Sequence, residues 1–561
     1  MKLHIQGQGQ VDLTQSDFLA SGGEGSVYVK GQTAFKVYID PKKMIPEGKI
    51  RELSSLTRPN IIKPSNVLLD AKGKAVGYTM KFVQHTYALC QLFTKSFRDR
   101  NNITPPMMLD LVRNLQETVK HVHDQKILIV DLNELNFLAT SDFKEVYAID
   151  VDSYQTPSFP ATAIMDTIRD RHTKTFSEMT DWFSFAIVSF QMFIGIHPYK
   201  GKHPTVKSLE DRMVKNVSVL DGTVGIPAIC YPFSVMPPVY LDWYRAVLED
   251  GKRVPPPNDL HAVATLVQTI KKIVGSNNFD LEECGEYKGN IIDVIFSGTE
   301  DIVITDRGWE TKKSIIPLPA GAVVRTSPKL NFVVAVYVQQ GNFKKIFNLS
   351  SNQEVYCNTP ADSVMKYDGR IYVKTGDKIV EEGMLEDLSF RKVTTLSIPV
   401  ANVLSGATRM FDGVVFQSLL GSCFASFFPK SGSHQQIRIK ELDSYRIVDA
   451  KYDNNVLMVI GASNGQYNRF VFRFSDNEYD VKVVPDISPA GLNFITLESG
   501  VCIHINEEEN VHVFSNKKDS TDVKIFDDPA ITSDMKLLKV GGRAMIARGT
   551  KLYKFGMKRK P

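Results

Sequence analysis

The chain shows two textures of hydrophobic and polar positions. Up to about residue 275 the pattern alternates between the two-residue period of strands and the longer period of helices. Beyond that point short alternating apolar runs recur, and no long helical pattern interrupts them. Because 561 residues are also too many for one hydrophobic core, the pattern predicts a mixed α+β unit at 1–275, a linker at 276–289 and an all-β domain at 290–561.

The first unit is expected to contain strands and helices in a definite order. Residues 17–38 are predicted to form paired strands around a glycine-rich turn, and residues 64–83 a hairpin that turns at 71–74. Helical periodicity marks 105–125, where proline stands in the first turn and its missing N–H costs little. Further helices are expected at residues 181–195, 239–250 and 258–274.

The second unit consists of short strand-like runs separated by turn residues. Examples are DVIFSG, DIVITD, FVVAVYV, GRIYVKTG and NVLMVIGAS. A four-stranded unit of about 40 residues has the size of a propeller blade. The region therefore predicts a six- or seven-bladed β-propeller that serves as an interaction domain, and a pair of β-sandwiches is the alternative.

Composition narrows the class of protein. A net charge of +4 with 23% charged residues gives no reason to expect nucleic acid as a partner. The start MKLHIQGQGQ lacks the apolar core of a secretory signal, and the uncharged run 182–196 is shorter than the roughly 20 residues of a membrane span. The six cysteines are scattered and form no C-x-x-C pair, which argues against zinc or disulfides and favours a reducing, cytoplasmic setting without membrane contact.

Candidate chemistry begins at the glycine-rich turn LASGGEGSVYVKGQTAFKVY. Gly22, Gly23 and Gly25 lie between two extended runs, where backbone N–H groups can approach phosphates closely. Lys36 follows on the next strand, from which a cation can reach the phosphates of a nucleotide.

A second constellation lies in ILIVDLNELNFLATSDFKEVYAIDVDSYQ. Asp131 follows an apolar run, Asn136 comes five residues later, and Asp150 closes a strand-like segment. Phosphoryl transfer needs a carboxylate near the acceptor hydroxyl and oxygen ligands that hold Mg²⁺ on the phosphates. The ordered set of glycine loop, lysine, D-x-x-x-x-N and late aspartate therefore predicts an ATP- and Mg²⁺-binding site.

These motifs resemble the protein kinase superfamily. Asp181 opens the buried run DWFSFAIVSFQMFIG, which is similar to the kinase D-x-W-S-F-G helix, and Arg253 resembles the arginine late in the kinase C-lobe. The motifs D-L-N and D-V-D-S resemble the corresponding motifs of compact bacterial and phage kinase-like proteins. The resemblance implies an N-lobe over residues 1–83 and a C-lobe over 84–275, in a bacterium or, if phage-encoded, in its host's cytoplasm.

The resemblance also implies roles for individual residues. Lys36 would position the phosphates, Asp131 would be the catalytic base, and a glutamate, Glu52 in preference to Glu47, would hold Lys36. The nucleotide-contacting set would be Gly22, Gly23, Gly25, Val27, Lys36, Glu52, the gatekeeper Met80, and Phe82 and Val83 of the hinge. The Mg²⁺ ligands would be Asn136 and Asp150. Asp152 is either a further ligand or a cap on the turn into Ser153.

Several positions depart from the kinase pattern. Ile129 and Val130 stand where His and Arg precede the catalytic aspartate, so control by phosphorylation of the activation segment is not expected. Asn133 replaces the lysine that contacts the transferring phosphate. No A-P-E occurs in 156–180, which removes the usual glutamate partner of Arg253.

The sequence therefore predicts an ATP- and Mg²⁺-dependent protein kinase acting on Ser or Thr, with the β domain recruiting a protein substrate or partner. The first alternative is a nucleotide-binding pseudokinase that acts as a scaffold through its β domain. The second is a phosphotransferase or nucleotidyl transferase with a different acceptor.

Overall fold

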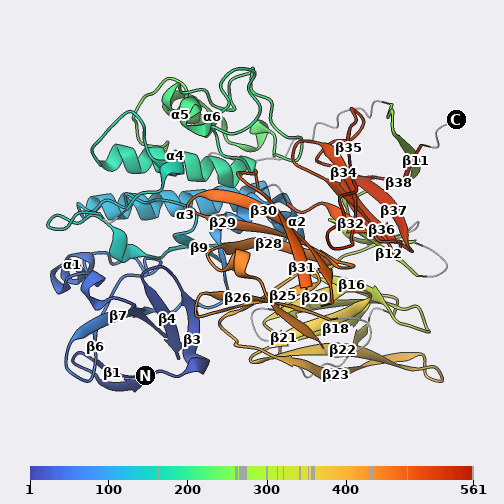
Figure 1. Ribbon diagram of the computed structural model, residues 1–561, viewed down its shortest axis with the longest axis horizontal. Coiled ribbons are helices and arrows are strands. Elements are labelled where there is room, and N and C mark those ends of the chain that lie inside the picture. The colour runs from blue at the N-terminus through green and yellow to red at the C-terminus, as the bar shows by residue number, and fades with distance from the viewer. Residues whose placement is uncertain are drawn as a thin grey trace.

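The computed structural model describes residues 1–561 except 162, 259–262, 264–274, 298–300, 312–313, 320, 340–342, 352, 356–359, 429–433, 477, 490 and 559–561. The predicted helix at 258–274 lies almost entirely outside the described residues. Figure 1 shows two halves side by side: a mixed α/β half in blue to green and a β-sheet half in yellow to red.

The N-terminal lobe is built on a seven-stranded sheet with the order β2-β1-β6-β7-β5-β4-β3. The predicted strands at 17–38 and the hairpin at 64–83 are confirmed as antiparallel pairs, whereas the opening hairpin β1–β2 was not predicted. One short helix, α1 (Glu47–Leu53), accompanies the sheet. The strands are β1 (Lys2–Ile5), β2 (Gly9–Asp12), β3 (Phe18–Ser21), β4 (Gly25–Lys30), β5 (Thr33–Tyr38), β6 (Val67–Leu69) and β7 (Ala75–Lys81).

The following lobe is mainly helical. The described helices include the three predicted ones, at 105–125, 181–195 and 239–250, shifted by at most three residues. The predicted helices are α3 (Pro105–Asp124), α4 (Glu178–Ile194) and α6 (Pro238–Leu248). Two shorter helices accompany them, α2 (Lys95–Arg100) and α5 (Leu209–Val214). A small sheet of order β10-β9-β8 completes the lobe, with β8 (Thr86–Ala88), β9 (Phe137–Thr140) and β10 (Val146–Ala148).

Helix α4 forms the centre of this lobe. Every residue from Thr180 to Ile194 is buried, which explains why the sequence shows a long uncharged run without a polar face. Gly195 ends the helix at φ 87°, a left-handed conformation that glycine adopts without strain. Among the described residues, none of the helices combines the length and apolarity required to cross a bilayer.

The described residues of the second half form seven four-stranded antiparallel sheets. Six of them use strands consecutive in sequence, and the remaining one has the order β11-β38-β37-β36. Their bounds are β12 (Ile291–Phe296), β13 (Asp301–Thr305), β14 (Gly308–Glu310), β15 (Ile315–Ile316); β16 (Val323–Thr326), β17 (Val333–Gln339), β18 (Phe343–Asn348), β19 (Gln353–Val355); β20 (Ser363–Tyr367), β21 (Arg370–Thr375), β22 (Lys378–Asp387), β23 (Lys392–Asn402); β24 (Thr408–Phe411), β25 (Val414–Leu419), β26 (Ser422–Phe427), β27 (Gln435–Arg438); β28 (Arg446–Asp453), β29 (Val456–Ser463), β30 (Gln466–Ser475), β31 (Glu478–Val484); β32 (Phe494–Thr496), β33 (Val501–Ile505), β34 (Asn510–Ser515), β35 (Val523–Asp527); and β36 (Lys536–Val540), β37 (Arg543–Arg548), β38 (Lys551–Met557).

The predicted linker at 276–289 is wrong, because residues Phe279–Glu286 form strand β11. This strand pairs antiparallel with β38 at the far end of the chain. Glu282 and Glu283 of this strand form ion pairs with Lys554 and Lys551 of β38. The first strand of the β half therefore completes the sheet made by its last three strands.

Hydrophobic clusters join the seven sheets in cyclic order. The cluster around Val303 and Leu538 joins the β11-containing sheet to β12–β15, and the cluster around Ile495 and Ile546 joins β32–β35 back to the β11-containing sheet. Five further clusters fill the five remaining junctions. Each sheet thus buries its faces against two neighbours, which gives the β half a closed series of cores.

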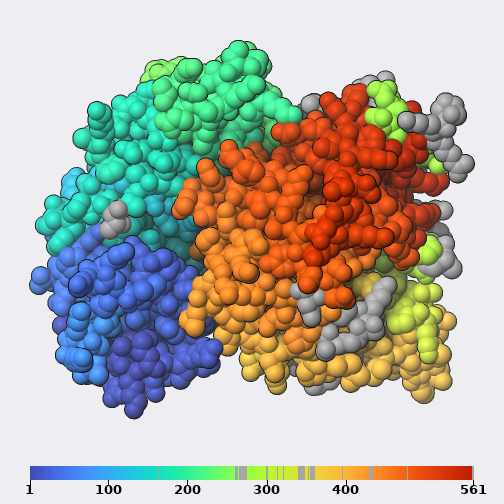
Figure 2. Space-filling view, in the orientation of Figure 1, coloured from blue at the N-terminus to red at the C-terminus, as the bar shows by residue number. Residues whose placement is uncertain are grey.

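The two halves share one core. Val448, Ile460, Ala462, Tyr467 and Ile487 of the β half belong to the same buried cluster as the helical lobe. Figure 2 shows the orange part of the β half packed broadly against the blue and teal half. Such a buried apolar contact resembles the interior of a domain more than a flexible tether between modules.

Candidate active site

The glycine-rich turn joins β3 to β4, and its glycines serve different purposes. Gly25 pairs with Tyr38 across the β4–β5 ladder, where a Cβ atom would lie 2.5 Å from the carbonyl oxygen of Val37. A Cβ at Gly22 or Gly23 would meet nothing within 4 Å. Gly25 is therefore required for strand packing, whereas Gly22 and Gly23 leave the tip of the loop open to a ligand.

A cavity of about 2950 Å³ lies below this loop. It is lined by nearly all residues predicted to contact nucleotide or metal: Gly22, Gly23, Gly25, Val27, Lys36, Met80, Phe82, Val83, Asn136 and Asp150. Ala34, Leu138 and Ile149 also line it, and sequence reasoning did not select them. With Val27 and Met80 they supply apolar contacts of the kind that a nucleotide base requires.

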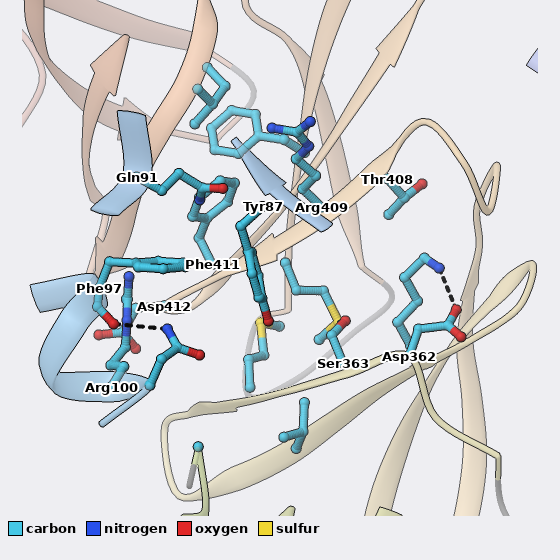
Figure 3. Close-up of a pocket in the computed structure, with 18 of the residues that line it drawn as sticks. Tyr87, Gln91, Phe97, Arg100, Asp362, Ser363, Thr408, Arg409, Phe411 and Asp412 are labelled. Atoms are coloured by element: carbon cyan, nitrogen blue, oxygen red, sulfur yellow. Dashed lines mark hydrogen bonds and ion pairs between the residues drawn. The ribbon is translucent and has the colours of Figure 1, made fainter. Parts of the chain in front are cut away.

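The same cavity continues between the two halves of the molecule. Figure 3 shows this part, where Tyr87 and Phe97 of the helical lobe face Arg409 and Phe411 of the β half. Burial and the nearby Arg446 lower the pKa of Arg409 to about 10. The cleft below the glycine-rich turn and the space beside the β half are thus one continuous hollow.

Lys36 is held by aspartates that follow β10. Its Nζ lies 2.7 Å from Asp152 Oδ2 and 3.3 Å from Asp150 Oδ1. The hydroxyl of Tyr38 donates a second bond to Asp152 Oδ2, at 2.7 Å. Burial opposes the charge of Lys36, but the two carboxylates outweigh it and hold the lysine pKa above its ordinary value. Burial likewise opposes the charge of Asp152, and Lys36 with the tyrosine hydroxyls holds the carboxyl pKa below its ordinary value.

The predicted partner of Lys36 is wrong, because Glu52 does not contact it. Glu52 Oε2 accepts a bond from the backbone N–H of Ser158, at 3.2 Å. Helix α1 instead buries Lys49, Ile50 and Leu53. The helix presents a lysine where a glutamate was expected, and the buried Asp152 takes the place of that glutamate as the partner of Lys36.

The loop between Asp131 and Asn136 has the geometry of a catalytic loop. The Asn136 amide donates to the Asp131 backbone carbonyl at 3.0 Å and to its carboxylate at 3.3 Å. The carboxylate of Asp181 accepts bonds from the backbone N–H groups of Ile129 and Val130, at 2.8 and 2.9 Å. Val130 adopts φ 63°, which a β-branched residue rarely does. Asp181 therefore holds a strained backbone immediately before Asp131.

Asp150 and Asn136 fit a Mg²⁺ site on an ATP-like ligand. The Asp150 side chain is 44% exposed and faces the cavity, and the bonds made by the Asn136 amide nitrogen leave its side-chain oxygen for a ligand. Enclosure in the cleft and the neighbouring Asp152 raise the pKa of Asp150 to about 6. Across the described part of the chain no three His, Cys, Asp or Glu residues form a metal cluster. Phosphate oxygens and water would therefore complete the coordination, as is usual for Mg²⁺.

Two departures from the kinase pattern have structural explanations. Asn133 is 1% exposed, and its side-chain oxygen accepts a bond from the Leu135 N–H at 2.8 Å, so it shapes the loop rather than facing a phosphate. Arg253 pairs with Asp170, which replaces the missing glutamate; its Nη2 lies 2.7 Å from Asp170 Oδ1 and its Nε 2.5 Å from Oδ2. The sequence gives no pattern that selects Asp170 among the acidic residues of 156–180.

Comparison with known proteins agrees with this geometry. No protein-family model matches the chain. Over 196 residues, 34% of its length, the chain is 26% identical to mitogen-activated protein kinase kinase kinase 13 of Mus musculus and of Homo sapiens, and 25% identical to mitogen-activated protein kinase kinase kinase 12 of Rattus norvegicus. It spans only about a fifth of the length of these relatives, 20% or 21%.

Among solved structures the chain is similar to the Cydia pomonella granulovirus kinase PK-1, with 13% identity over 42% of this chain and 86% of that one. The TM-score of this likeness is 0.33. In its sequence likeness, its two-lobed architecture and the grouping of Lys36, Asn136 and Asp150, the first half of this chain is similar to proteins of the protein kinase superfamily.

Proposed function

We propose that the protein is an ATP- and Mg²⁺-dependent protein kinase that phosphorylates Ser or Thr. The observation that carries the proposal is the convergence of Lys36, Asn136 and Asp150 on one cavity, next to a loop that Asp181 holds in place. Side chains that served only the folding of the protein would not need to converge on one cavity in this arrangement.

Each residue would have a defined part in the reaction. Lys36 would exchange part of its pairing with Asp150 for the phosphates of ATP, while Asp152 keeps it in place. Asn136 and Asp150 would hold Mg²⁺, which would neutralise charge on the transferring phosphate. Asp131 would orient the acceptor hydroxyl and take its proton. One oxygen of Asp131 accepts the backbone N–H of Met165 at 2.8 Å, so the acceptor would approach beside the 156–180 segment.

We further propose that the seven sheets are the blades of a seven-bladed β-propeller and that it recruits a protein substrate or partner. The cyclic order of the intersheet clusters and the pairing of β11 with β38 support the propeller. Loops on a rigid disc are suited to protein binding. The described cysteines are free thiols, in keeping with a cytoplasmic site of action.

One observation favours the alternative of a nucleotide-binding pseudokinase scaffold. The neutral Asn133 stands in place of a lysine and is turned into its own loop, so it offers the transferring phosphate neither a positive charge nor a nearby side chain. Loss of one such group lowers catalytic rates by about a hundredfold to a thousandfold in other enzymes. A slow enzyme and an inactive nucleotide binder are thus the two outcomes to separate.

The deciding experiment is phosphate transfer from radiolabelled ATP with Mg²⁺ to a generic protein acceptor and to the chain itself. Wild type is compared with Lys36→Ala, Asp131→Asn and Asp150→Ala, and with Asp242→Asn, an exposed aspartate of α6, as the control. The proposal expects labelling in wild type and Asp242→Asn only, on Ser or Thr by phosphoamino acid analysis. Nucleotide-dependent thermal stabilisation without labelling would favour the scaffold. Intact mass separates transfer of a phosphate from transfer of a nucleotide.

A further inference from the structure

We propose that sheet β28–β31 of the β half positions the catalytic loop, with Tyr467 and Arg446 as positioning residues for Asp131 and Asn136. The inference rests on the proposed kinase function. It assigns the β half a role inside the active site, in addition to the recruitment of partners.

The first contact joins Tyr467 to the middle of the catalytic loop. Glu134 lies between Asp131 and Asn136 and is 2% exposed, and Tyr467 of β30 is 3% exposed. The tyrosine hydroxyl donates to Glu134 Oε1 at 2.6 Å. A buried carboxyl group needs such a partner, because leaving it unsatisfied carries a desolvation cost.

The second contact holds the next residue of the loop. Nη1 of Arg446, at the start of β28, donates to the backbone carbonyl of Leu135 at 3.0 Å. Adjacent residues of the loop, Glu134 and Leu135, are therefore both held by one sheet of the β half. Asp181 holds the loop before Asp131, and the β half holds it after Asp131.

The third contact reaches the segment that faces the acceptor. Asn464 and Gly465 form the turn between β29 and β30, with φ 50° and 69°. A Cβ at Gly465 would lie 2.5 Å from Met165 Sδ and closer still to Thr167 Oγ1. Met165 is the residue whose N–H bonds Asp131 Oδ1. The same hairpin thus packs on the segment next to the carboxylate and, through Tyr467, on the loop that carries it.

These contacts have a functional consequence that simple packing would not require. The carboxylate of Asp131 and the amide of Asn136 are fixed relative to each other by the hydrogen bonds between them. Their position relative to the acceptor depends on contacts made outside the kinase-like half. Small displacements of a catalytic group lower turnover more than nucleotide affinity, since Lys36 and the apolar walls of the cleft are unaffected.

The first test compares Tyr467→Phe with Tyr479→Phe in the full chain. Tyr479 makes an equivalent bond, to Glu441 at 2.7 Å, entirely within the β half. Tyr467→Phe is expected to lower kcat at least tenfold with an unchanged KM for ATP, and to speed amide hydrogen exchange at 131–136. Tyr479→Phe is expected to change neither. Equal kcat and equal exchange in the two variants would overturn the proposal.

The second test uses a matched pair of turn glycines. Gly465→Ala places a methyl group against Met165 and Thr167, whereas Gly369→Ala imposes the same backbone strain, at φ 73°, in a turn with nothing within 4 Å of the new atom. Both variants lose backbone freedom, but only Gly465→Ala is expected to lower kcat and alter exchange at 163–168. A similar loss in both variants would contradict a specific contact.

The exchange measurement keeps this inference separate from the kinase proposal. If wild type transfers no phosphate, the kinase proposal fails, and faster exchange at 131–136 in Tyr467→Phe alone still supports the positioning contact. If wild type transfers phosphate and Tyr467→Phe matches it in both readouts, the kinase proposal stands and the positioning role is wrong.

Discussion

Lys36 and Asp152 form the shortest of the three ion pairs made by this lysine, with Nζ 2.7 Å from Oδ2. The lysine comes from the N-terminal sheet and the aspartate from the turn after β10, so the pair joins the two lobes. Asp152 therefore pairs with Lys36 through Oδ2, and the further metal ligation considered from the sequence stays a prediction.

Asp152→Asn is expected to destabilise the protein and weaken ATP binding together. Removing one partner of a buried ion pair costs about 3–5 kcal/mol, because the other charge is left without its partner. Glu52→Gln is the control, because Glu52 lies on α1 and bonds only the 156–180 segment; a surface change of this kind alters stability by less than about 0.5 kcal/mol. Urea unfolding and ATP titration measure both effects, and equal losses in the two variants would restore the role expected for Glu52.

Glu24→Gln is expected to strengthen ATP binding. The Glu24 carboxylate reaches from the glycine-rich turn to 3.6 Å from Lys36 Nζ, where it competes with incoming phosphates. Because the Glu24 partner is exposed, the pair is expected to be worth about 0.2–1 kcal/mol, which corresponds to at most about a fivefold gain in affinity. Glu47→Gln, an exposed change outside the cavity lining, is the control for net charge. Weaker binding in Glu24→Gln would show that Glu24 assists the nucleotide instead.

Gly25→Ala and Gly23→Ala are expected to affect different properties: the first the stability of the fold, the second the binding of ATP. The methyl group of Gly25→Ala meets the Val37 carbonyl and should destabilise the N-terminal sheet by about 1–3 kcal/mol, the cost of overpacking. Gly23→Ala has free space and should leave the melting temperature unchanged while hindering close approach of the turn to phosphates. Thermal melting with and without ATP distinguishes them. If both variants melted normally, the structural role assigned to Gly25 would be incorrect.

Acid destabilisation is expected to depend on His197. Its Nε2 donates to the Thr167 carbonyl at 2.9 Å and its Nδ1 accepts the Tyr199 N–H at 3.1 Å, so the folded protein holds it neutral. Burial lowers the pKa of His197 to about 3. The unfolded chain therefore binds a proton below about pH 6.5 that the folded chain does not, and the stability from this group is lost at about 1.4 kcal/mol per pH unit as pH falls from 6.5 to 3.

The measurement is urea unfolding of wild type and His197→Gln between pH 7.5 and 4.5. Wild type should lose the additional stability below pH 6.5, and the variant, weaker at neutral pH, should show a flatter dependence. His203→Gln, a change at a partly exposed histidine outside this hydrogen-bond network, is the control. Parallel pH profiles in all three proteins would exclude His197 as the source.

The sequence was most informative where the relevant residues are close in the chain or on adjacent strands. Asp131 and Asn136 are five residues apart, and Lys36 follows the glycine-rich turn across one hairpin, so spacing alone identified them. Strand β11 was also visible in the sequence, since Phe279 and Leu281 alternate with Asp280 and Glu282, but its charges were read as a linker.

Contacts between distant segments were not predictable in this way. The rotation of α1, only seven residues long, determines whether Glu52 or Lys49 faces inward, and the apolar positions Ile50 and Leu53 fit either choice. The bond between Glu134 and Tyr467 joins residues 333 positions apart. No local pattern marks either residue, because each is selected by the surface of the other half.

The pairing of β11 with β38 also constrains the order of events during synthesis. Domains fold as they emerge from the ribosome, N-terminal parts first. The kinase-like half can become compact early, but the sheet opened by Phe279–Glu286 stays incomplete until Lys551–Met557 has been translated. If the β half positions the catalytic loop, the loop in a nascent chain would lack its full support until β38 has emerged and paired with β11.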